Sequence, residues 1–189
     1  MADHSPAAGA GNSDPGEPAP LTPTQIATLL DASRRAVILE LEALAPYGDY
    51  RPFAGEWCPN EVVGHLIEAE KRGFAGRVRS MLAEENPALQ TWVPPAVAAA
   101  RHDDARASSE LAAEFGALRD ESLALVRSLG PAALARSGRH PQVGEVTVRD
   151  IIHEWVHHDR KHLVQLTELT RRLVWPGMGN ARRFSQPDA

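Results

Sequence analysis

The chain has 189 residues, of which 43% are hydrophobic and 24% are charged, enough for one hydrophobic core but short of two. Its formal net charge of −5 disfavours binding to other negatively charged surfaces, such as phosphate backbones and acidic lipids. We therefore do not expect nucleic acid or a membrane as a partner. The single cysteine, Cys58, excludes an intrachain disulfide framework and a cysteine-rich metal site. Because neither a signal peptide nor an apolar run of about 20 residues is visible, we expect a cytoplasmic protein with a small-molecule substrate.

Residues 1–20 contain proline, glycine, alanine and acids, with no lysine or arginine and no large apolar residue after Met1. Such a segment cannot bury a core, and we predict a disordered tail. A helical bundle is expected over residues 21–175. Residues 176–189 are polar and are expected to form a partly ordered C-terminal tail.

Apolar residues recur at three- and four-residue spacing in four segments, which predicts four amphipathic helices. The first covers about residues 23–44 and the second about 59–86, each starting at a capping box. The third covers 111–129, and the fourth covers about 148–174 after another capping box. With no convincing strand pattern, this predicts an all-α protein, an up-down four-helix bundle.

Two connections are predicted to be loops. Residues 87–105 show no periodicity, and a loop of this length in a compact domain is often functional. Residues 137–144 are rich in residues that interrupt helices and strands.

The last helix carries four histidines: His153, His157, His158 and His162. A projection at about 100° per residue places His158 and His162 in the apolar arc of this helix and the other two on its polar face. Two histidines one turn apart can bind one metal ion, and burying them without a bond is costly. We therefore predict that His158 and His162 belong to a metal site.

Residues 153–157 (HEWVH) also match H-E-x-x-H, the zinc metalloprotease motif. Both histidines of the match fall on the polar face, and Leu163 occupies the position of a third metzincin histidine. We interpret the match as accidental and expect His153 and His157 to be exposed.

A metal site open for chemistry usually has three protein ligands, so a third residue is needed from another helix. His65, at the edge of the apolar arc of the second helix, is the best candidate, although a core histidine without a metal is an equal alternative. Asp159 and Gln165 flank the histidine face of the last helix, and Glu68 lies one turn from His65. These three could orient the ligands or form ordinary interhelical hydrogen bonds, and Glu68 could act as a general base.

Two further positions of the second helix are unusual. Cys58 at its start could be a reactive thiol or an inert buried residue, and the inert interpretation is favoured. Glu70 and Arg77 fall inside the apolar arc, so we expect a buried ion pair between them or with Arg119.

Three segments carry a family resemblance: residues 57–66 (WCPNEVVGHL), 140–148 (HPQVGEVTV) and 155–165 (WVHHDRKHLVQ). In this order they resemble the DinB/YfiT-like superfamily of metal-binding four-helix bundles, and the similarity spans about residues 22–175. The resemblance implies that one divalent metal ion is bound by three histidines, which here are His65, His158 and His162. Zinc or nickel is the expected ion, with manganese and iron as alternatives, and a homodimer is expected from the resemblance alone.

The resemblance implies a metal site more firmly than a reaction. Some relatives transfer a low-molecular-weight bacterial thiol, such as bacillithiol or mycothiol, to an electrophile, so a metal-dependent thiol transferase is the leading hypothesis. The alternatives are a metal-dependent hydrolase that uses a metal-bound water and a non-catalytic bundle that binds a metal or small molecule. Trp57 and Trp92 are candidate substrate contacts, with core packing as the alternative.

Overall fold

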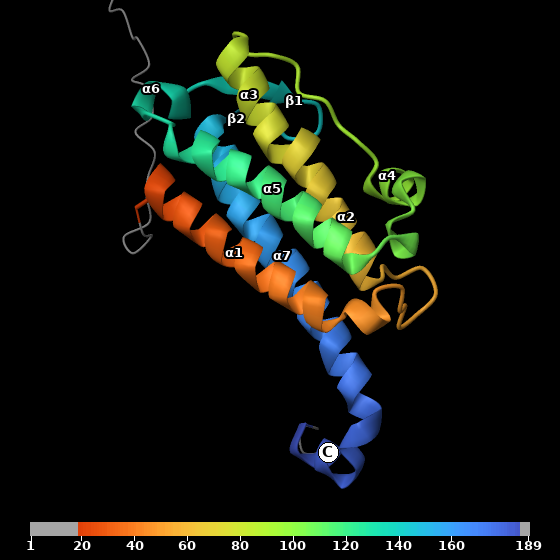
Figure 1. The fold of residues 1–189 in the computed structure, drawn as a ribbon. Coiled ribbons are helices and arrows are strands. Elements are labelled where there is room, and N and C mark those ends of the chain that lie inside the picture. Colours follow the sequence, from red (N-terminus) through yellow and green to blue (C-terminus); the bar gives the residue numbers. More distant parts are fainter. Residues whose placement is uncertain (1–18, 186–189) are drawn as a thin grey trace, which may run out of the picture.

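The computed structural model describes residues 19–185 and shows four long helical segments with a short β-hairpin at one end (Figure 1). The predicted all-α four-helix bundle is confirmed. Residues 1–18 of the predicted N-terminal tail and residues 186–189 lie outside the described part. The main elements are α1 (Pro23–Ala43), α2 (Pro59–Glu68), α3 (Ala75–Ala83), α4 (Pro94–Arg101), α5 (Ser108–Arg127), α6 (Pro131–Leu134), β1 (Ser137–His140), β2 (Gly144–Thr147) and α7 (Val148–Val174).

The predicted capping boxes of α1 and α7 are present. At α1, the backbone N–H of Gln25 donates to the Thr22 hydroxyl at 3.3 Å, and the N–H of Thr22 donates to the Gln25 side chain at 2.9 Å. At α7, Asp150 donates to the Thr147 hydroxyl at 3.2 Å and accepts from the Thr147 N–H at 2.8 Å. Each box satisfies backbone donors that a helix end leaves unpaired.

The four long segments are not arranged in simple sequence order around the bundle. Both α1 and the α2–α3 segment pack mainly against α5 and α7, so α1 and α2 lie at diagonal positions. The α2–α3 segment and α5 run in the same direction, because Asn60 bonds Ser108 near their starts and Glu70 bonds Arg119 further along. The up-down alternation is therefore interrupted once, where residues 84–107 return along the bundle (Figure 1).

This returning connection is not only a loop, contrary to the prediction for residues 87–105. It contains α4, where proline stands at the first helical positions and an alanine-rich run follows. His102 ends the helix in the left-handed region, with φ of 52°. The turn after it lies so close to α2 that a Cβ on Gly64 would be 1.8 Å from Oδ2 of Asp103, so glycine is required there.

The predicted loop at residues 137–144 is also corrected, because it contributes to an antiparallel hairpin of β1 and β2. Ser137 pairs with Thr147, and His140 pairs with Gly144, whose φ of 81° allows the turn. Strands of four residues contain too few positions for a period of two to be recognised. The hairpin covers one end of the bundle, where Gly138 packs against Met81.

The second predicted helix is continuous but irregular. Between α2 and α3 the segment Ala69–Phe74 is π-helical, and α3 ends at Ala83 rather than near Asn86. A π-helical segment has wider turns than an α-helix, so it rotates the residues that follow it, and such segments are frequent at functional sites. Here it begins one turn after His65.

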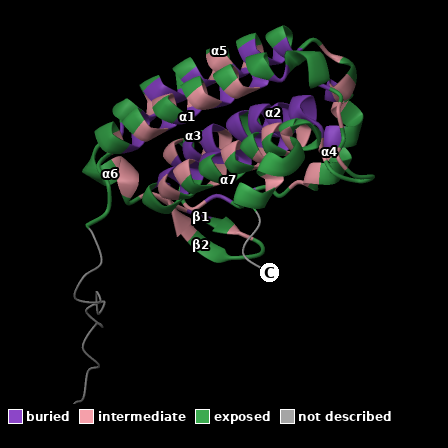
Figure 2. Cartoon of the chain, turned by 90° about the horizontal axis from the view of Figure 1, so that it is seen from below, coloured by how far each residue is buried: buried purple, intermediate pink, exposed green. Residues whose placement is uncertain are grey.

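The core consists of two hydrophobic clusters separated by a buried polar layer. Figure 2 shows the buried residues on the inward faces of the helices. One cluster includes Leu30, Phe74 and Trp155, and the other includes Val37, Leu66 and Leu166. Buried polar residues stand between them on each long helix: Ser33, Glu70, Arg119 and Asp159.

Beyond α7, residues Trp175–Ser185 form short helical turns with a break at Gly179. Residues 176–185 belong to the predicted C-terminal tail, of which the last four residues are not described. No helix in residues 19–185 combines the length and apolarity that crossing a membrane requires.

Candidate metal centre

Three histidines from two helices meet on one side of the bundle. His65 comes from α2, and His158 and His162 come from consecutive turns of α7. Their ligand nitrogens lie within 4.8 Å of one another, and Nε2 of His65 is 3.0 Å from Nε2 of His158. In the part of the chain that the structure describes, this is the only such group with metal-binding geometry. The structure thus brings together the three predicted ligands.

The chemistry of these side chains fits a divalent metal ion. Burial and the neighbouring histidines lower the pKa of His65 to about 4 and that of His158 to about 3, and burial also lowers the pKa of His162. All three rings are therefore neutral near pH 7, with lone pairs available. Nδ1 of His158 is buried without a hydrogen-bond partner among the described residues, and the Nε2 atoms of His158 and His65 face each other, so these Nε2 atoms are the ones placed to bind an ion. Three neutral imidazoles are a typical ligand set for zinc and related ions.

Gln165 supports the site directly. Its side-chain oxygen lies 3.0 Å from Nδ1 of His162. Because an amide oxygen only accepts, Nδ1 of His162 carries the proton and Nε2 carries the lone pair. Gln165 therefore selects the tautomer that can bind a metal through Nε2.

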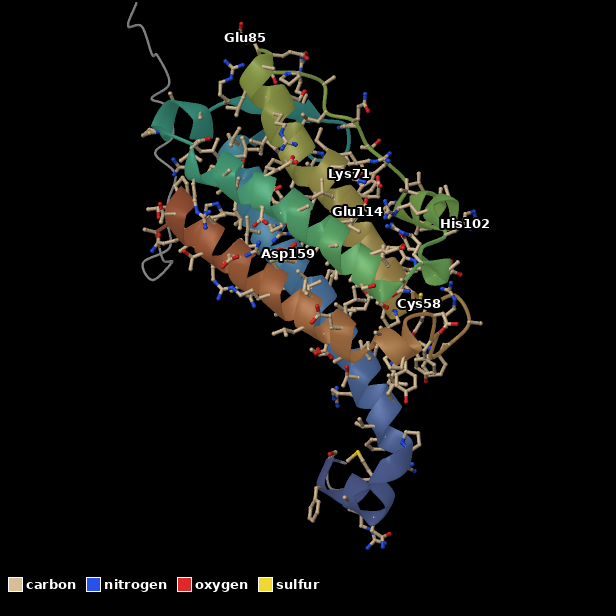
Figure 3. The ribbon with its side chains drawn as sticks, in the orientation of Figure 1. Cys58, Lys71, Glu85, His102, Glu114 and Asp159 are labelled. Atoms are coloured by element: carbon tan, nitrogen blue, oxygen red, sulfur yellow. The ribbon has the colours of Figure 1, made fainter. Side chains whose placement is uncertain are left out.

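The other two candidate supporting residues are engaged by arginines. Asp159 accepts two hydrogen bonds from Arg119, at 2.6 Å and 3.1 Å, and points into the bundle (Figure 3). Glu68 accepts from Arg101 at 2.7 Å. Neither carboxylate bonds a histidine of the centre, so the structure does not place Glu68 as a general base or Asp159 as a ligand partner.

Aromatic side chains surround the three histidines. The ring centroids of Trp57 and Trp92 lie 5.0 Å and 5.6 Å from that of His65, and Trp92 is stacked on it. Phe74, at the end of the π-helical segment, meets His158 edge-on at 5.1 Å. The two tryptophans therefore lie at the centre, where the sequence indicates substrate contacts, while Phe74 has no signal in the sequence beyond its place in the core pattern.

A cavity of about 900 Å³ adjoins the three histidines, a volume typical of small-molecule sites. Its walls include the three aromatic residues named above and, among charged residues, Glu56, Arg77, Glu154, Lys161, Glu168 and Arg172. The centre is thus accessible to a ligand of small-molecule size.

The H-E-x-x-H match lies apart from this centre. His153 is half-buried rather than exposed as predicted, and both of its nitrogens are engaged: Nε2 accepts from the N–H of Leu21 at 3.1 Å, and Nδ1 lies 2.8 Å from the carbonyl oxygen of Arg149. The side chain of His157 is 78% exposed. The motif therefore forms no metal-binding group in the described residues.

Cys58 lies at the start of α2 and is fully buried (Figure 3). Burial raises the pKa of its thiol to about 11, so the thiol is protonated at neutral pH. Its backbone N–H donates to Glu61 at 3.0 Å, and its side chain does not line the cavity. This favours an inert cysteine.

A buried ion network lies in the polar layer of the core. Arg119 is fully buried and bonds both Glu70 and Asp159. Glu70 also accepts from Ser122 at 2.6 Å and from the indole N–H of Trp155 at 3.0 Å. The sequence left Arg77 and Arg119 as possible ion-pair partners of Glu70, and the structure shows the pair with Arg119. The network joins α2–α3, α5 and α7 beside the centre.

Comparison with known proteins agrees with this geometry. The family model of the DinB superfamily matches residues 48–166. YfiT of Bacillus subtilis, which carries the provisional name of a metal-dependent hydrolase, is 27% identical over 140 residues, covering 74% of this chain and 75% of that protein. A protein of Oceanobacillus iheyensis with the same provisional name is 25% identical over 122 residues, covering 65% of this chain and 70% of that protein.

Solved structures show the same fold. The structure of YfiT from Bacillus subtilis, described as an unusual four-helix bundle, has a TM-score of 0.74 at 21% identity and covers 85% of this chain and 93% of that one. An uncharacterised protein from Clostridium difficile 630 has a TM-score of 0.61 at 11% identity, covering 79% and 96%. Because the family model covers more than half of its residues, the chain belongs to the DinB superfamily and has a YfiT-like fold.

Proposed function

We propose that this protein is a metal-dependent enzyme that holds one divalent ion on His65, His158 and His162 and acts on a small molecule in the adjoining cavity. The observation that carries the proposal is the convergence of three neutral histidines at a cavity of about 900 Å³. The provisional names of the relatives support metal dependence. Zinc and nickel are the expected ions, with manganese and iron as alternatives.

An ion at this site would act as a Lewis acid that lowers the pKa of a small nucleophile, either water or a thiol. The protein's own residues position the reaction. Gln165 keeps the lone pair of His162 on Nε2. Trp57 and Trp92 shield His65 from water and offer flat apolar surfaces to a substrate.

Hydrolysis is the first candidate, because the curated relatives are provisionally named as hydrolases. A hydrolase needs a group that accepts the proton of the attacking water. The carboxylates that line the cavity are Glu56 and Glu154, which are exposed, and Glu168, which is half-buried. One of these would have to serve as the base.

Transfer of a low-molecular-weight thiol, of the bacillithiol or mycothiol type, is the second candidate. It is favoured by the engagement of Glu68 and Asp159 with arginines, which leaves the centre without a buried free carboxylate among the described residues. A thiol whose pKa the ion lowers would release its proton to solvent near neutral pH and would need no such base. Its sulfur would form a bond to an electrophilic carbon, and the leaving group would depart with its electron pair.

Metal analysis followed by activity assays tests the proposal. The purified protein should contain about one divalent ion per chain, and chelation should abolish turnover of ester or amide substrates, or of an electrophile supplied with a thiol. Hydrolysis without thiol supports the first candidate, and strictly thiol-dependent transfer supports the second. Equal activity with and without metal would overturn metal dependence. Metal binding without any turnover would support the remaining alternative, a non-catalytic bundle that binds a metal.

The homodimer remains a separate proposal that rests on the family. Sedimentation at micromolar concentration should show a species of twice the chain mass, and a monomer alone would contradict it.

A further inference from the structure

The cavity beside the three histidines contains an arginine without a carboxylate partner. Arg77 lies on α3, one turn after Phe74, whose ring contacts His158. One of its terminal nitrogens, Nη2, donates to the backbone oxygen of Gln90 at 3.3 Å and lies 3.2 Å from Nε2 of His140. Its Nε is buried and has no hydrogen-bond partner among the described residues. The guanidinium is thus held in place by neutral groups only.

Two other arginines, one fully buried and one half-buried, are paired with carboxylates. Arg119 is neutralised by Glu70 and Asp159, and Arg101 by Asp103 and Glu68. Arg77 forms no ion pair within residues 19–185. Because a guanidinium stays charged at neutral pH, removing it from water without an opposite charge costs free energy. A bound ligand that carries a negative charge would offset this cost.

None of the carboxylates that line the cavity, Glu56, Glu154 and Glu168, forms an ion pair with Arg77 within residues 19–185. Glu154 is exposed, and its carboxylate lies 4.0 Å from Nδ1 of His157. Glu168 pairs with Arg172 and Arg171. Lys161 also lines the cavity and forms no ion pair in the described part, so it adds positive charge.

We infer that Arg77 binds the anionic group, a carboxylate or phosphate, of the small molecule that this cavity receives. The planar guanidinium matches the paired oxygens of these groups. Phe74, in contact with His158, and Trp92, stacked on His65, line the same cavity as Arg77. The ligand class is therefore a small organic acid or phosphate ester with an apolar or aromatic middle. That its reactive group lies at the metal rests on the proposed function, whereas anion binding rests on Arg77.

Calorimetric titration of the metal-free protein tests the inference, because without metal a carboxylate cannot bind the ion instead. The probes are 3-phenylpropionate and its uncharged amide, 3-phenylpropionamide, which differ only in the anionic group. Phenyl phosphate, compared with 3-phenylpropionate, identifies the preferred anion. The wild-type protein should bind one of the two anions more tightly than the amide by about tenfold or more.

Substitutions assign this preference to Arg77. Arg77→Met should remove it while leaving amide binding unchanged, and Arg77→Lys should retain part of it. Arg136→Met is the matched control, since Arg136 is also half-buried and donates to backbone oxygens, but does not line the cavity. Thermal unfolding confirms that each variant is folded, and Arg77→Lys keeps the test valid should Arg77→Met fail to fold.

Equal affinity of the wild-type protein for all three probes would overturn the inference, as would an anion preference that survives in Arg77→Met. The result is separable from the proposed function. An Arg77-dependent preference in a protein that binds no divalent ion would support the anion site and refute the metal-dependent enzyme. Metal-dependent turnover without any anion preference would support the metal-dependent enzyme and refute the anion site at Arg77.

Discussion

Nδ1 of His162 lies 3.0 Å from the side-chain oxygen of Gln165, one turn further along α7. The two residues belong to the same helix, so their approach is set by helical spacing rather than by packing between helices. The bond fixes which nitrogen of His162 is free for a metal. It gives the centre a preorganised ligand before any ion arrives.

Gln165→Leu should weaken metal binding by about 10- to 100-fold, because His162 loses the acceptor that selects its tautomer. The dissociation constant for zinc, measured by competition with a chromophoric chelator, checks this. Gln165→Glu keeps an acceptor and should retain the affinity. An unchanged affinity in Gln165→Leu would show that the bond does not orient His162.

His158→Ala and His162→Ala should each remove most of the bound metal, since each deletes one of three ligands. The double variant His153→Ala/His157→Ala should leave the metal content unchanged. Elemental analysis of the purified proteins decides between these outcomes. Loss of metal from the double variant would return the H-E-x-x-H motif to consideration.

Arg119→Met should lower the free energy of unfolding by about 3–5 kcal/mol, because it leaves Glu70 and Asp159 buried without a counter-charge. Urea unfolding measures the loss. The triple variant that adds Glu70→Gln and Asp159→Asn removes the unpaired charges and should recover part of the stability. A triple variant less stable than Arg119→Met would contradict this explanation.

The stability of the metal-free protein should fall as the pH is lowered from about 6.5 towards 4. Burial lowers the pKa of His65 from 6.5 to about 4 and that of His158 from 6.5 to about 3. Below pH 6.5 the unfolded chain therefore binds protons that the folded chain excludes, which favours unfolding. Urea unfolding at several pH values measures the effect. His158→Leu should reduce the slope and His153→Leu should not, and equal slopes would contradict the assignment.

Cys58 should react slowly with iodoacetamide in the native protein, because its thiol is buried and its pKa is raised to about 11. Mass spectrometry of the labelled protein follows the reaction, and denaturation should make it fast. Cys58→Ser should keep both the metal and any activity. Loss of activity in Cys58→Ser with the metal retained would make the cysteine part of the chemistry.

Local features were determined by the sequence itself. The bounds of α7 follow from the Thr147–Asp150 capping box and the stop at Pro176, and its periodicity places His158 and His162 on the inward face. These signals involve residues within a turn or two of one another, so no knowledge of the rest of the fold is needed. The same holds for α1, which begins at its predicted capping box.

Features that depend on distant segments were decided only by the tertiary structure. The sequence left open whether His65 faces the two histidines of α7 and whether Glu70 pairs with Arg77 or Arg119. It predicted loops where α4 and the β-hairpin form, and it contained no sign of the π-helical segment. The first two depend on contacts between residues far apart in the chain, whereas α4 and the strands of the hairpin are too short for their periodicity to be recognised. The same contacts leave Arg77 in the cavity wall without a carboxylate partner in the described part of the chain.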